Sequence, residues 1–503
     1  MQRVRSGEHK NCTGRWTLER PIGRPKADTT LYKRRFEQFA NFIFDVVASS
    51  VSMSVPSGHR DPESGWVIRV TPRNGDTRTI HMRASRCSSR ASIAREIAER
   101  VPGAVSNISS VDFLQLVEED VRSAKRKLPV MRSVDQCGYF AEADMWVFPG
   151  CTLDGTGKKC DSHVFLTDAV SRSGMSLTRC TAPIASSLSA SAAELSAVCG
   201  AVARCYGPAR MHAMHVLSMA WKAVHRQRVM ESESCISVCN IFGPPNVGKT
   251  FISAVTCALL GCDAMIISRA TQSAMLDYAH FFRNLIVIWD DPRDVAPKVM
   301  EAVVHEAFHG HASSTMKHGE RRYNSTLVIG TQTENLGIAG LDSATCSRLT
   351  HIDFAACSSG LEKDGEQELK SRLSTASRAF ACLLGSAYDR GEVDAAYADL
   401  KAVCPDVIDR SVRSLAVDVV AMTRIGAISC AFSKADVLDY VREYQLPCLQ
   451  RKCNTVNVWD QFSADVESAY AGVPNGTRGV KRGVRVSIGT VSYTHLRAHE
   501  TVE

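Results

Sequence analysis

Hydrophobic side chains change their spacing several times along the chain, and each spacing predicts an element of secondary structure. Residues 236–242 form a short apolar run, residues 243–250 read GPPNVGKT, and residues 251–261 are apolar at helical spacing. This order predicts a strand, a glycine-rich turn and a helix. Residues 284–291 begin as a continuous apolar run and end in two aspartates, which predicts a strand buried on both faces.

The region before residue 190 has shorter patterns. Residues 31–47, after the potential cap Asp28, are apolar at positions 31, 39, 43 and 46 and predict a helix. Residues 66–82 alternate on either side of an Asn-Gly turn and predict a β-hairpin. Residues 91–101 predict a helix, and residues 136–149 predict a further pair of strands.

Helical spacing dominates much of the remaining chain. Residues 192–230 predict helices that lead into the glycine-rich turn, and a helix is expected from Pro297 to His309. Residues 311–332 predict a basic polar hairpin followed by an apolar strand with a polar tip. Residues 366–384 and 410–423 again predict helices.

These patterns predict an α/β fold with a parallel sheet at its centre. The expected regions are a basic arm and helix (1–50), an α+β N-terminal module (60–190), a core with leading helices (191–356) and a helical C-terminal region (357–490). The Ser/Pro/Gly-rich residues 49–65 predict a linker. Residues 491–503 resemble a translated sequencing-library adapter, so we expect them to be an artefact and the true C-terminus to be missing.

Composition narrows the class of protein. A chain of 503 residues is expected to form more than one domain, and 45% hydrophobic with 22% charged residues is typical of a soluble protein. No apolar run reaches the ~18 residues of a membrane span, and the N-terminus lacks the apolar core of a secretory signal. The 19 scattered cysteines favour a reducing compartment, the cytoplasm or a host nucleus. The close pairs Cys235/Cys239 and Cys448/Cys453 could hold zinc or serve as small apolar residues.

Charge is concentrated at one end of the chain. The formal net charge is +7, and residues 1–40 alone contribute +6. Such an arm could contact phosphate backbones, although a solvated tail is the alternative. Within it, Gly23-Arg24-Pro25-Lys26 resembles the core of a minor-groove AT-hook.

The glycine-rich turn has the chemistry of a phosphate loop. Glycines at both ends let the backbone curl so that successive N–H groups point at one anion, and the following helix adds its positive N-terminal end. Lys249 could reach the β- and γ-phosphates, and Thr250 offers a hydroxyl to Mg²⁺. The expected nucleotide-binding residues are Gly243, Pro244, Pro245, Asn246, Val247, Gly248, Lys249 and Thr250.

The acid pair fits the same site. Two acids at the carboxyl end of a buried strand lie where open α/β sheets bind ligands. We expect Asp290 to hold Mg²⁺ and Asp291 to orient or deprotonate the attacking water.

The order of these motifs resembles that of superfamily 3 helicases, the class that small DNA viruses use for replication. The match runs from residue 236 to residue 354: phosphate loop, acid-tipped strand, basic hairpin, polar-tipped strand and arginine. The resemblance implies an AAA+-like P-loop ATPase that uses ATP and Mg²⁺. It also implies a homo-oligomeric ring, expected to be a hexamer, on single-stranded or forked DNA and without a membrane partner.

The resemblance assigns further roles. In papillomavirus members the hairpin carries a Lys-His pair, and Lys317 and His318 fall at that place as DNA contacts; a solvated loop is the alternative. The family's third motif ends its strand in Asn, whereas Thr331 and Gln332 stand here, and either could position a water or sense the γ-phosphate. Arg348 is expected to act as an arginine finger on a neighbouring subunit, the alternative being a surface ion pair.

Residues 66–335 also resemble, in element order, helicase-like proteins of phages and mobile elements whose N-terminal module has no assigned function. The first hypothesis is therefore an ATP-driven helicase or translocase of a virus or mobile element. The second is a non-motor ATPase switch that assembles on DNA and recruits replication or transposition factors. A third, a structural DNA-binding protein with a decayed site, is disfavoured by the intact lysine, threonine and acid pair.

Overall fold

The computed structural model places only part of the chain. The described residues are 2–6, 15–22, 35–52, 64–72, 76–123, 128–160, 164–166, 181–262, 266–268, 270–292, 295–310, 312–315, 319–334, 336, 343–355 and 360–450. They all lie in the first of two compact units, residues 1–452. The expected adapter-like segment, the AT-hook-like tetrapeptide, Cys453, Lys317 and His318 lie outside the described residues.

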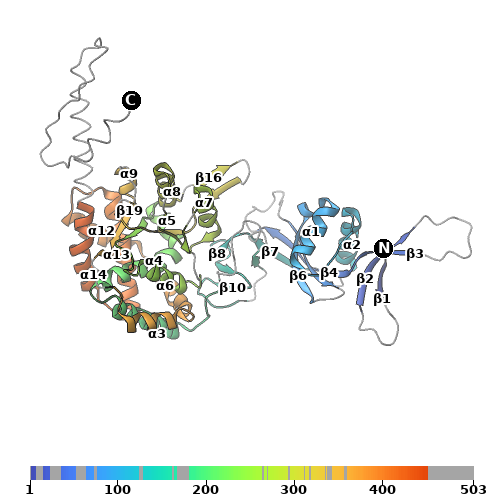
Figure 1. Cartoon of the computed structure of the whole chain (residues 1–503), viewed down its shortest axis with the longest axis horizontal. Coiled ribbons are helices and arrows are strands. Elements are labelled where there is room, and N and C mark those ends of the chain that lie inside the picture. The colour runs from blue at the N-terminus through green and yellow to red at the C-terminus, as the bar shows by residue number, and fades with distance from the viewer. Residues whose placement is uncertain are drawn as a thin grey trace, which may run out of the picture. The chain divides into compact units, whose positions relative to one another are not determined.

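Five parallel strands form the central sheet of the core (Figure 1). In spatial order they are β13 (Ile266–Ile267), β15 (Ile286–Asp290), β18 (Thr326–Gly330), β12 (Val238–Phe242) and β19 (Leu349–Asp353). The three middle strands are almost entirely buried, as continuous apolar runs require when helices cover both faces of a sheet. The predicted parallel α/β core is thus confirmed.

Helices before and between these strands supply the rest of the core. They are α3 (Leu188–Tyr206), α4 (Arg210–Val224), α5 (Arg226–Glu233), α6 (Lys249–Leu259), α7 (Gln272–Phe281), α8 (Pro297–His309) and α9 (Ser343–Cys346). Helix α4 is buried on every side from residue 212 onward, so it is an interior helix. Pro297 begins α8 and Gly310, at φ +61°, ends it, as the sequence predicts.

The C-terminal region is helical, as expected. Its helices are α10 (Lys363–Arg372), α11 (Phe380–Gly385), α12 (Arg390–Val403), α13 (Asp409–Ser429), α14 (Lys434–Tyr440) and a π-helical turn (Val441–Gln445). The predicted single helix over residues 366–384 is wrong, because α10 ends at Arg372 and a 3₁₀ turn (Ala376–Ala379) precedes α11.

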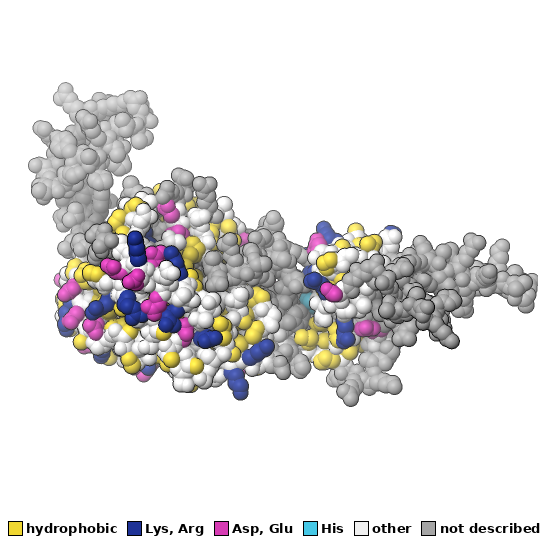
Figure 2. Space-filling model, turned by 60° about the horizontal axis from the view of Figure 1, so that its bottom comes forward, with side chains coloured by type: hydrophobic (Ala, Val, Ile, Leu, Met, Phe, Trp, Pro, Cys, Tyr) yellow, Lys and Arg dark blue, Asp and Glu magenta, His cyan; other side chains and the backbone are white. Residues whose placement is uncertain are grey.

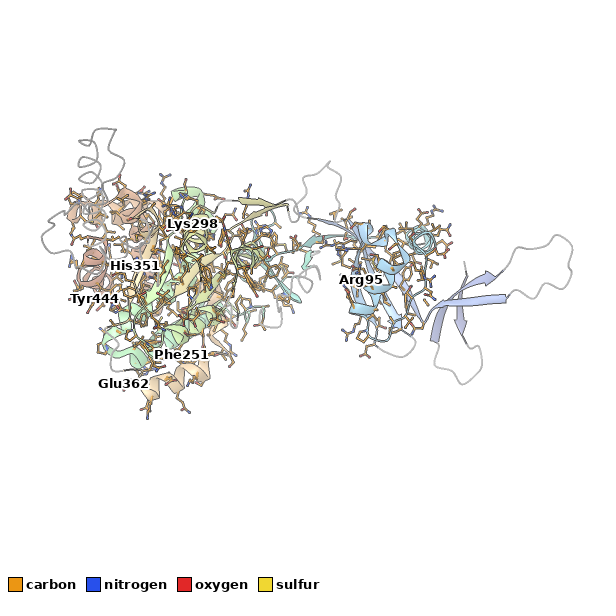
Figure 3. The ribbon with its side chains drawn as sticks, turned by 45° about the horizontal axis from the view of Figure 1, so that its top comes forward. Arg95, Phe251, Lys298, His351, Glu362 and Tyr444 are labelled. Carbon is orange, nitrogen blue, oxygen red and sulfur yellow. The ribbon has the colours of Figure 1, made fainter. Side chains whose placement is uncertain are left out.

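The N-terminal module is built on a second five-stranded sheet. Its order is β11 (Val164–Leu166), β7 (Val130–Val134), β4 (Phe42–Ser52), β5 (Gly65–Pro72) and β6 (Arg78–Arg83), with α1 (Arg90–Arg100) and α2 (Ser110–Ser123) beside it. Strands β5 and β6 pair antiparallel, so the predicted hairpin is confirmed, as is the predicted helix at α1. Arg95 of α1 is labelled in Figure 3.

The helix predicted over residues 31–47 is wrong where the structure describes it, because β3 (Arg35–Ala40) and β4 lie there. Burial in β4 follows a period of two, since Phe42, Phe44, Ala48 and Ser50 are buried, and the pairing register with β5 shifts between Val46 and Ala48. Strand β4 runs to Ser52 and β5 begins at Gly65, so both ends of the predicted linker lie in strands. Further upstream, within the predicted basic arm, β1 (Gln2–Ser6) pairs with β2 (Arg15–Ile22), and β2 pairs with β3.

A small sheet joins the N-terminal module to the core. The predicted strand pair is confirmed as β8 (Cys137–Phe140) and β9 (Met145–Phe148), with β10 (Cys151–Asp154) beside it. The fourth strand, β14 (Phe282–Arg283), comes from the core and pairs with β8. The backbones approach so closely that a Cβ on Gly138 would lie 1.9 Å from the Arg283 carbonyl oxygen.

The predicted basic hairpin is confirmed in its backbone, since β16 (Ala312–Thr315) and β17 (Gly319–Arg322) pair antiparallel. Among the described residues no helix is long and apolar enough to cross a bilayer. Figure 2 shows basic and acidic side chains interspersed over the described surface on one face of the molecule.

Candidate nucleotide site

The glycine-rich turn has the backbone that its sequence predicts. Strand β12 ends at Phe242 and helix α6 begins at Lys249, with Gly243 at φ +138° and Gly248 at φ +86°. Side chains are also excluded by space, since a Cβ on Gly243 would lie 3.0 Å from the Phe354 backbone. Left-handed geometry and close neighbours therefore require glycine at both positions.

Lys249 lies back across the turn. Its Nζ donates hydrogen bonds to the carbonyl oxygens of Gly243 (2.7 Å) and Pro244 (2.6 Å). Burial lowers the pKa of Lys249, although Asp290 and Asp291 act in the opposite direction. The ammonium thus lies at the open side of the loop, held by backbone carbonyls and by the field of two acids.

Thr250 and Asp290 meet across the edge of the sheet. The Thr250 hydroxyl donates to Asp290 Oδ2 at 3.0 Å. On the neighbouring strand, Gly330 pairs with Asp290, and a Cβ there would lie 2.7 Å from Asp290 Oδ1. Burial raises the pKa of Asp290 and the Asp291 charge adds to this, while the Thr250 hydrogen bond and Lys249 oppose it. We call Lys249, Thr250 and Asp290 the carboxyl-edge cluster.

Asp291 leaves the strand in a different direction. It adopts φ +49°, uncommon for a residue other than glycine, and its N–H donates to the Gly330 carbonyl oxygen at 2.7 Å. The tight turn places two consecutive carboxylates at one strand end. Its backbone strain lies at the predicted site, which is where such strain is commonly found.

The two candidates after β18 differ in environment. Thr331 is 4% exposed, and its hydroxyl lies 3.0 Å from Asn240 Oδ1 and 2.8 Å from the Thr333 carbonyl oxygen. Gln332 is exposed. The threonine hydroxyl is therefore engaged by its neighbours, whereas the glutamine side chain faces the surface at this edge.

Asn240 is a polar residue that the sequence interpretation missed. It is fully buried in the middle of β12, and its amide donates to the Glu334 carbonyl oxygen at 2.8 Å and lies 3.1 Å from His351 Nδ1. With the Thr331 contact, it ties β12 to the segment after β18. The available signal was one asparagine inside an otherwise apolar strand, since a buried amide needs partners.

Arg348 does not join this cluster. It precedes β19, so it lies at the amino edge of the sheet, about 16 Å away along a five-residue strand. The side chain is 9% exposed; Nη1 donates to the Ala344 carbonyl oxygen, and the guanidinium lies 5.5 Å from the Phe308 ring centre. Arg348 is therefore largely buried at this edge rather than solvated.

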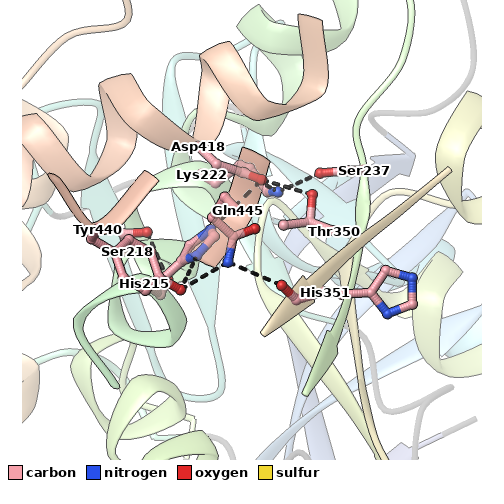
Figure 4. A network of polar contacts seen from close by, with 9 residues as sticks. All are labelled: His215, Ser218, Lys222, Ser237, Thr350, His351, Asp418, Tyr440 and Gln445. Atoms are coloured by element: carbon pink, nitrogen blue, oxygen red, sulfur yellow. Dashed lines mark hydrogen bonds and ion pairs between the residues drawn. The ribbon is translucent and has the colours of Figure 1, made fainter. Parts of the chain in front are cut away.

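The same amino edge holds a buried ion pair (Figure 4). Lys222 Nζ lies 2.6 Å from Asp418 Oδ1 and donates to Ser237 Oγ at 2.9 Å, while the Thr350 hydroxyl donates to Asp418 Oδ2 at 2.8 Å. Burial alone would raise the pKa of Asp418, but Lys222 and His215 outweigh it and the pKa falls to about 2. We call Lys222, Asp418 and Thr350 the amino-edge cluster.

Two cavities lie elsewhere in the described part of the chain. One has a volume of about 230 Å³ and the other, an open trough, about 780 Å³, and Arg228 and Glu231 of α5 line both. None of the predicted site residues lines either cavity.

Among the described residues, Thr250 and Asp290 are the groups that we consider as ligands for a metal ion. No group of three or more His, Cys, Asp or Glu side chains within the described ranges could hold a metal ion alone. Mg²⁺ at phosphate sites typically takes one or two protein oxygens and completes its shell with phosphates and water. Thr250 and Asp290 fit that pattern. Cys239 is buried with its pKa raised to about 12, in keeping with a small apolar role.

Comparison with known proteins bears on the fold. No protein-family model and no curated protein matches the sequence. Among solved structures, the active helicase Cch of SCCmec type IV is similar with a TM-score of 0.51 and 11% identity, over 86% of this chain and 80% of that one. The C-terminal region of NrS-1 (TM-score 0.30, 14% identity, 68% and 67% covered) and the JCV helicase (TM-score 0.25, 12% identity, 48% and 66% covered) are weaker matches. The chain therefore has a helicase-like α/β fold.

Proposed function

We propose that the chain is an ATP-dependent helicase or translocase of the superfamily 3 type, with an AAA+-like P-loop core. It would act on single-stranded or forked DNA in the replication of a virus or mobile element. The observation that carries the proposal is the meeting of Lys249, Thr250 and Asp290 at the carboxyl edge of a parallel sheet. Open α/β sheets bind their ligands at this edge.

Phosphate binding would fall to the loop and to the start of α6. The first N–H groups of a helix have no partner within the helix and carry its positive end, so they suit an anion. Lys249 would exchange its two loop carbonyls for phosphate oxygens. The exchange is favourable because a charged phosphate is a stronger acceptor than a neutral carbonyl.

Thr250 and Asp290 would hold Mg²⁺, which supplies neutralisation of charge on the transferring phosphate. The half-buried carboxylate with a raised pKa would be stabilised by a divalent cation. Strand β18 lies between the loop strand and the acid strand, so its end faces the gap between phosphate and acids. Asp291 and the exposed Gln332 are therefore the groups we assign to the attacking water.

Arg348 would act only on a neighbouring subunit, because its own loop lies at the opposite edge of the sheet. This agrees with a ring in which each interface completes one site. The guanidinium would have to leave its packing on Phe308 to reach a phosphate.

The test measures ATP hydrolysis with and without single-stranded DNA, followed by unwinding of a forked duplex. A motor should show DNA-stimulated hydrolysis and unwinding. Lys317→Ala/His318→Ala should then keep basal hydrolysis but lose both DNA stimulation and unwinding. The reason is that the lysine cation and the histidine ring would contact the DNA strand. An ATPase that never unwinds would instead be the recruiting switch, and a chain without hydrolysis would refute both.

A further inference from the structure

The phosphate loop is contacted at Gly248 by two residues distant in the sequence, Tyr206 and Leu361. Tyr206 is the last residue of α3, and Gly207 at φ +48° ends that helix abruptly. The Tyr206 side chain is 3% exposed, and its ring meets Phe354 edge-on at 6.0 Å. Its hydroxyl donates to the Gly248 carbonyl oxygen at 2.8 Å.

The same carbonyl has a second donor. Gly248 O accepts the Ile252 N–H at 2.9 Å, the hydrogen bond that opens α6. Tyr206 therefore adds to the helix start without replacing any of its bonds. A Cβ on Gly248 would lie 2.8 Å from the Tyr206 hydroxyl and 2.7 Å from a Leu361 methyl group, so the two side chains fill the space behind the loop.

The brace is itself fixed. The Glu362 N–H donates to the Cys205 carbonyl oxygen at 2.9 Å, which ties the segment carrying Leu361 to the end of α3. Gly365 of α10 packs directly on this helix end, since a Cβ there would lie 2.5 Å from Cys205 N. Figure 3 labels Glu362 and, in the first turn of α6, Phe251. The Tyr206 hydroxyl thus projects from a rigid helix junction.

We propose that Tyr206 is a positioning residue for the phosphate loop. In a trans peptide the carbonyl and the following N–H point in opposite directions. By holding the Gly248 carbonyl, Tyr206 directs the Lys249 N–H away from itself and toward the anion side of the loop. The inference rests on the proposed function, in that the anion is the phosphate chain of a nucleotide.

The test compares the full chain with Tyr206→Phe, which removes only the hydroxyl. Affinities for ATP with Mg²⁺ and for inorganic tripolyphosphate are measured by calorimetry, together with KM and kcat for hydrolysis. We expect both affinities to weaken by about fivefold, the typical effect of one hydrogen bond, and KM to rise equally while kcat stays within about twofold. The thermal midpoint should hardly move, because Gly248 O keeps its Ile252 donor.

Tyr440→Phe is the matched control. This tyrosine is also 3% exposed, and its hydroxyl accepts from Gln445 Nε2 at 2.9 Å and lies 3.2 Å from His215 Nδ1, away from the loop. Its loss should lower the thermal midpoint and leave both affinities unchanged.

Three outcomes would overturn the inference in distinguishable ways. Unchanged affinities in Tyr206→Phe would mean that the hydroxyl does not position the loop. Weakening of ATP binding alone, with tripolyphosphate unaffected, would place Tyr206 at the base or sugar. If the unaltered chain binds neither ligand, the proposed function fails first and the inference fails with it.

Discussion

The two edges of the central sheet carry the same three residue types in opposite states of pairing. In the amino-edge cluster, Lys222 and Asp418 are 0% and 1% exposed, and each charged group meets at least two polar partners. In the carboxyl-edge cluster, Lys249 bonds only neutral carbonyls, and Thr250 is exposed.

The pKa values of Asp418 and Asp290 move in opposite directions because the two carboxyl groups have different partners. Both carboxyl groups are penalised by burial, but only Asp418 has an ammonium in contact, so its pKa falls to about 2 while that of Asp290 rises. A satisfied buried pair holds elements together. The half-buried Asp290 accepts a hydrogen bond from one neutral hydroxyl, and Lys249 donates to neutral carbonyls, so both charged groups can gain charged partners. Such perturbed charged groups are typical of functional sites.

The largest expected effect is the loss of ATP hydrolysis on substitution of Lys249, the lysine of the carboxyl-edge cluster. Lys249→Ala should reduce ATP hydrolysis by on the order of 10³ or more, because it removes the side-chain cation directed at the transferring phosphate. Thermal unfolding should be nearly unchanged. Near-normal turnover by this folded variant would show that the carboxyl-edge cluster is not the site of hydrolysis.

Arg348→Ala tests whether the amino edge is wholly structural. If the guanidinium serves a neighbouring site, turnover should fall by on the order of 10³. Mixed assemblies of Arg348→Ala and Lys249→Ala subunits should then regain part of the activity. Inactive mixtures in which both variants are shown to co-assemble would argue against a trans-acting arginine.

Lys222→Met should destabilise the fold by about 3–5 kcal/mol, because it leaves the Asp418 charge buried without its partner. The control is the double variant Lys222→Met/Asp418→Leu, which should recover most of that loss because no unpaired charge remains. Urea unfolding measures both. A single variant as stable as the parent would show that this pair does not anchor α13 to α4.

Acid stability should report the same pair. Asp418 has its pKa lowered to about 2 from 3.8, so its contribution is present above pH 4 and is lost as pH falls toward 2. Over this window the free energy of unfolding should fall more steeply in the parent than in the double variant, by up to about 1.4 kcal/mol per pH unit. Parallel curves for the two proteins would contradict the assignment.

Asp290→Asn should give the smallest effect on stability, and its sign should be opposite to that of Lys222→Met. The raised pKa means that ionised Asp290 costs stability near neutral pH, so the neutral amide should stabilise the nucleotide-free chain by ~0.5 kcal/mol, solvent screening being strong at a half-exposed group. Mg²⁺-dependent hydrolysis should be lost. Destabilisation on this substitution would mean that Asp290 is already satisfied.

Much of the candidate site was predictable because its geometry is local. The strand, the turn with two positive-φ glycines and α6 are consecutive, and the acid pair directly ends β15. In a parallel sheet, strand ends of the same kind meet at one edge, so the contact between Thr250 and Asp290 follows from strand order. Lys249, Thr250 and Asp290 therefore come together through the order of the strands in the sheet, whereas Arg348 lies at the opposite edge.

The helix predicted over residues 31–47 failed for a related reason. The same segment also has apolar residues with a period of two, at Phe42, Phe44 and Val46, and pairing of β4 with β5 and β7 decided in favour of the strand. Strand propensity depends on such neighbours more than helix propensity does.

The sequence alone determined the glycine-rich turn, the acid-tipped strand and the parallel core, since spacing and glycine placement specify them within a few residues of one another. Tertiary structure alone decided that Lys249 contacts backbone carbonyls, whereas Lys222 is buried in an ion pair. Lys222 and Asp418 are 196 residues apart in the sequence, and Tyr206 and Gly248 are 42 residues apart. A residue's partners across such distances are set by how helices pack on the sheet, and packing is not written in local periodicity.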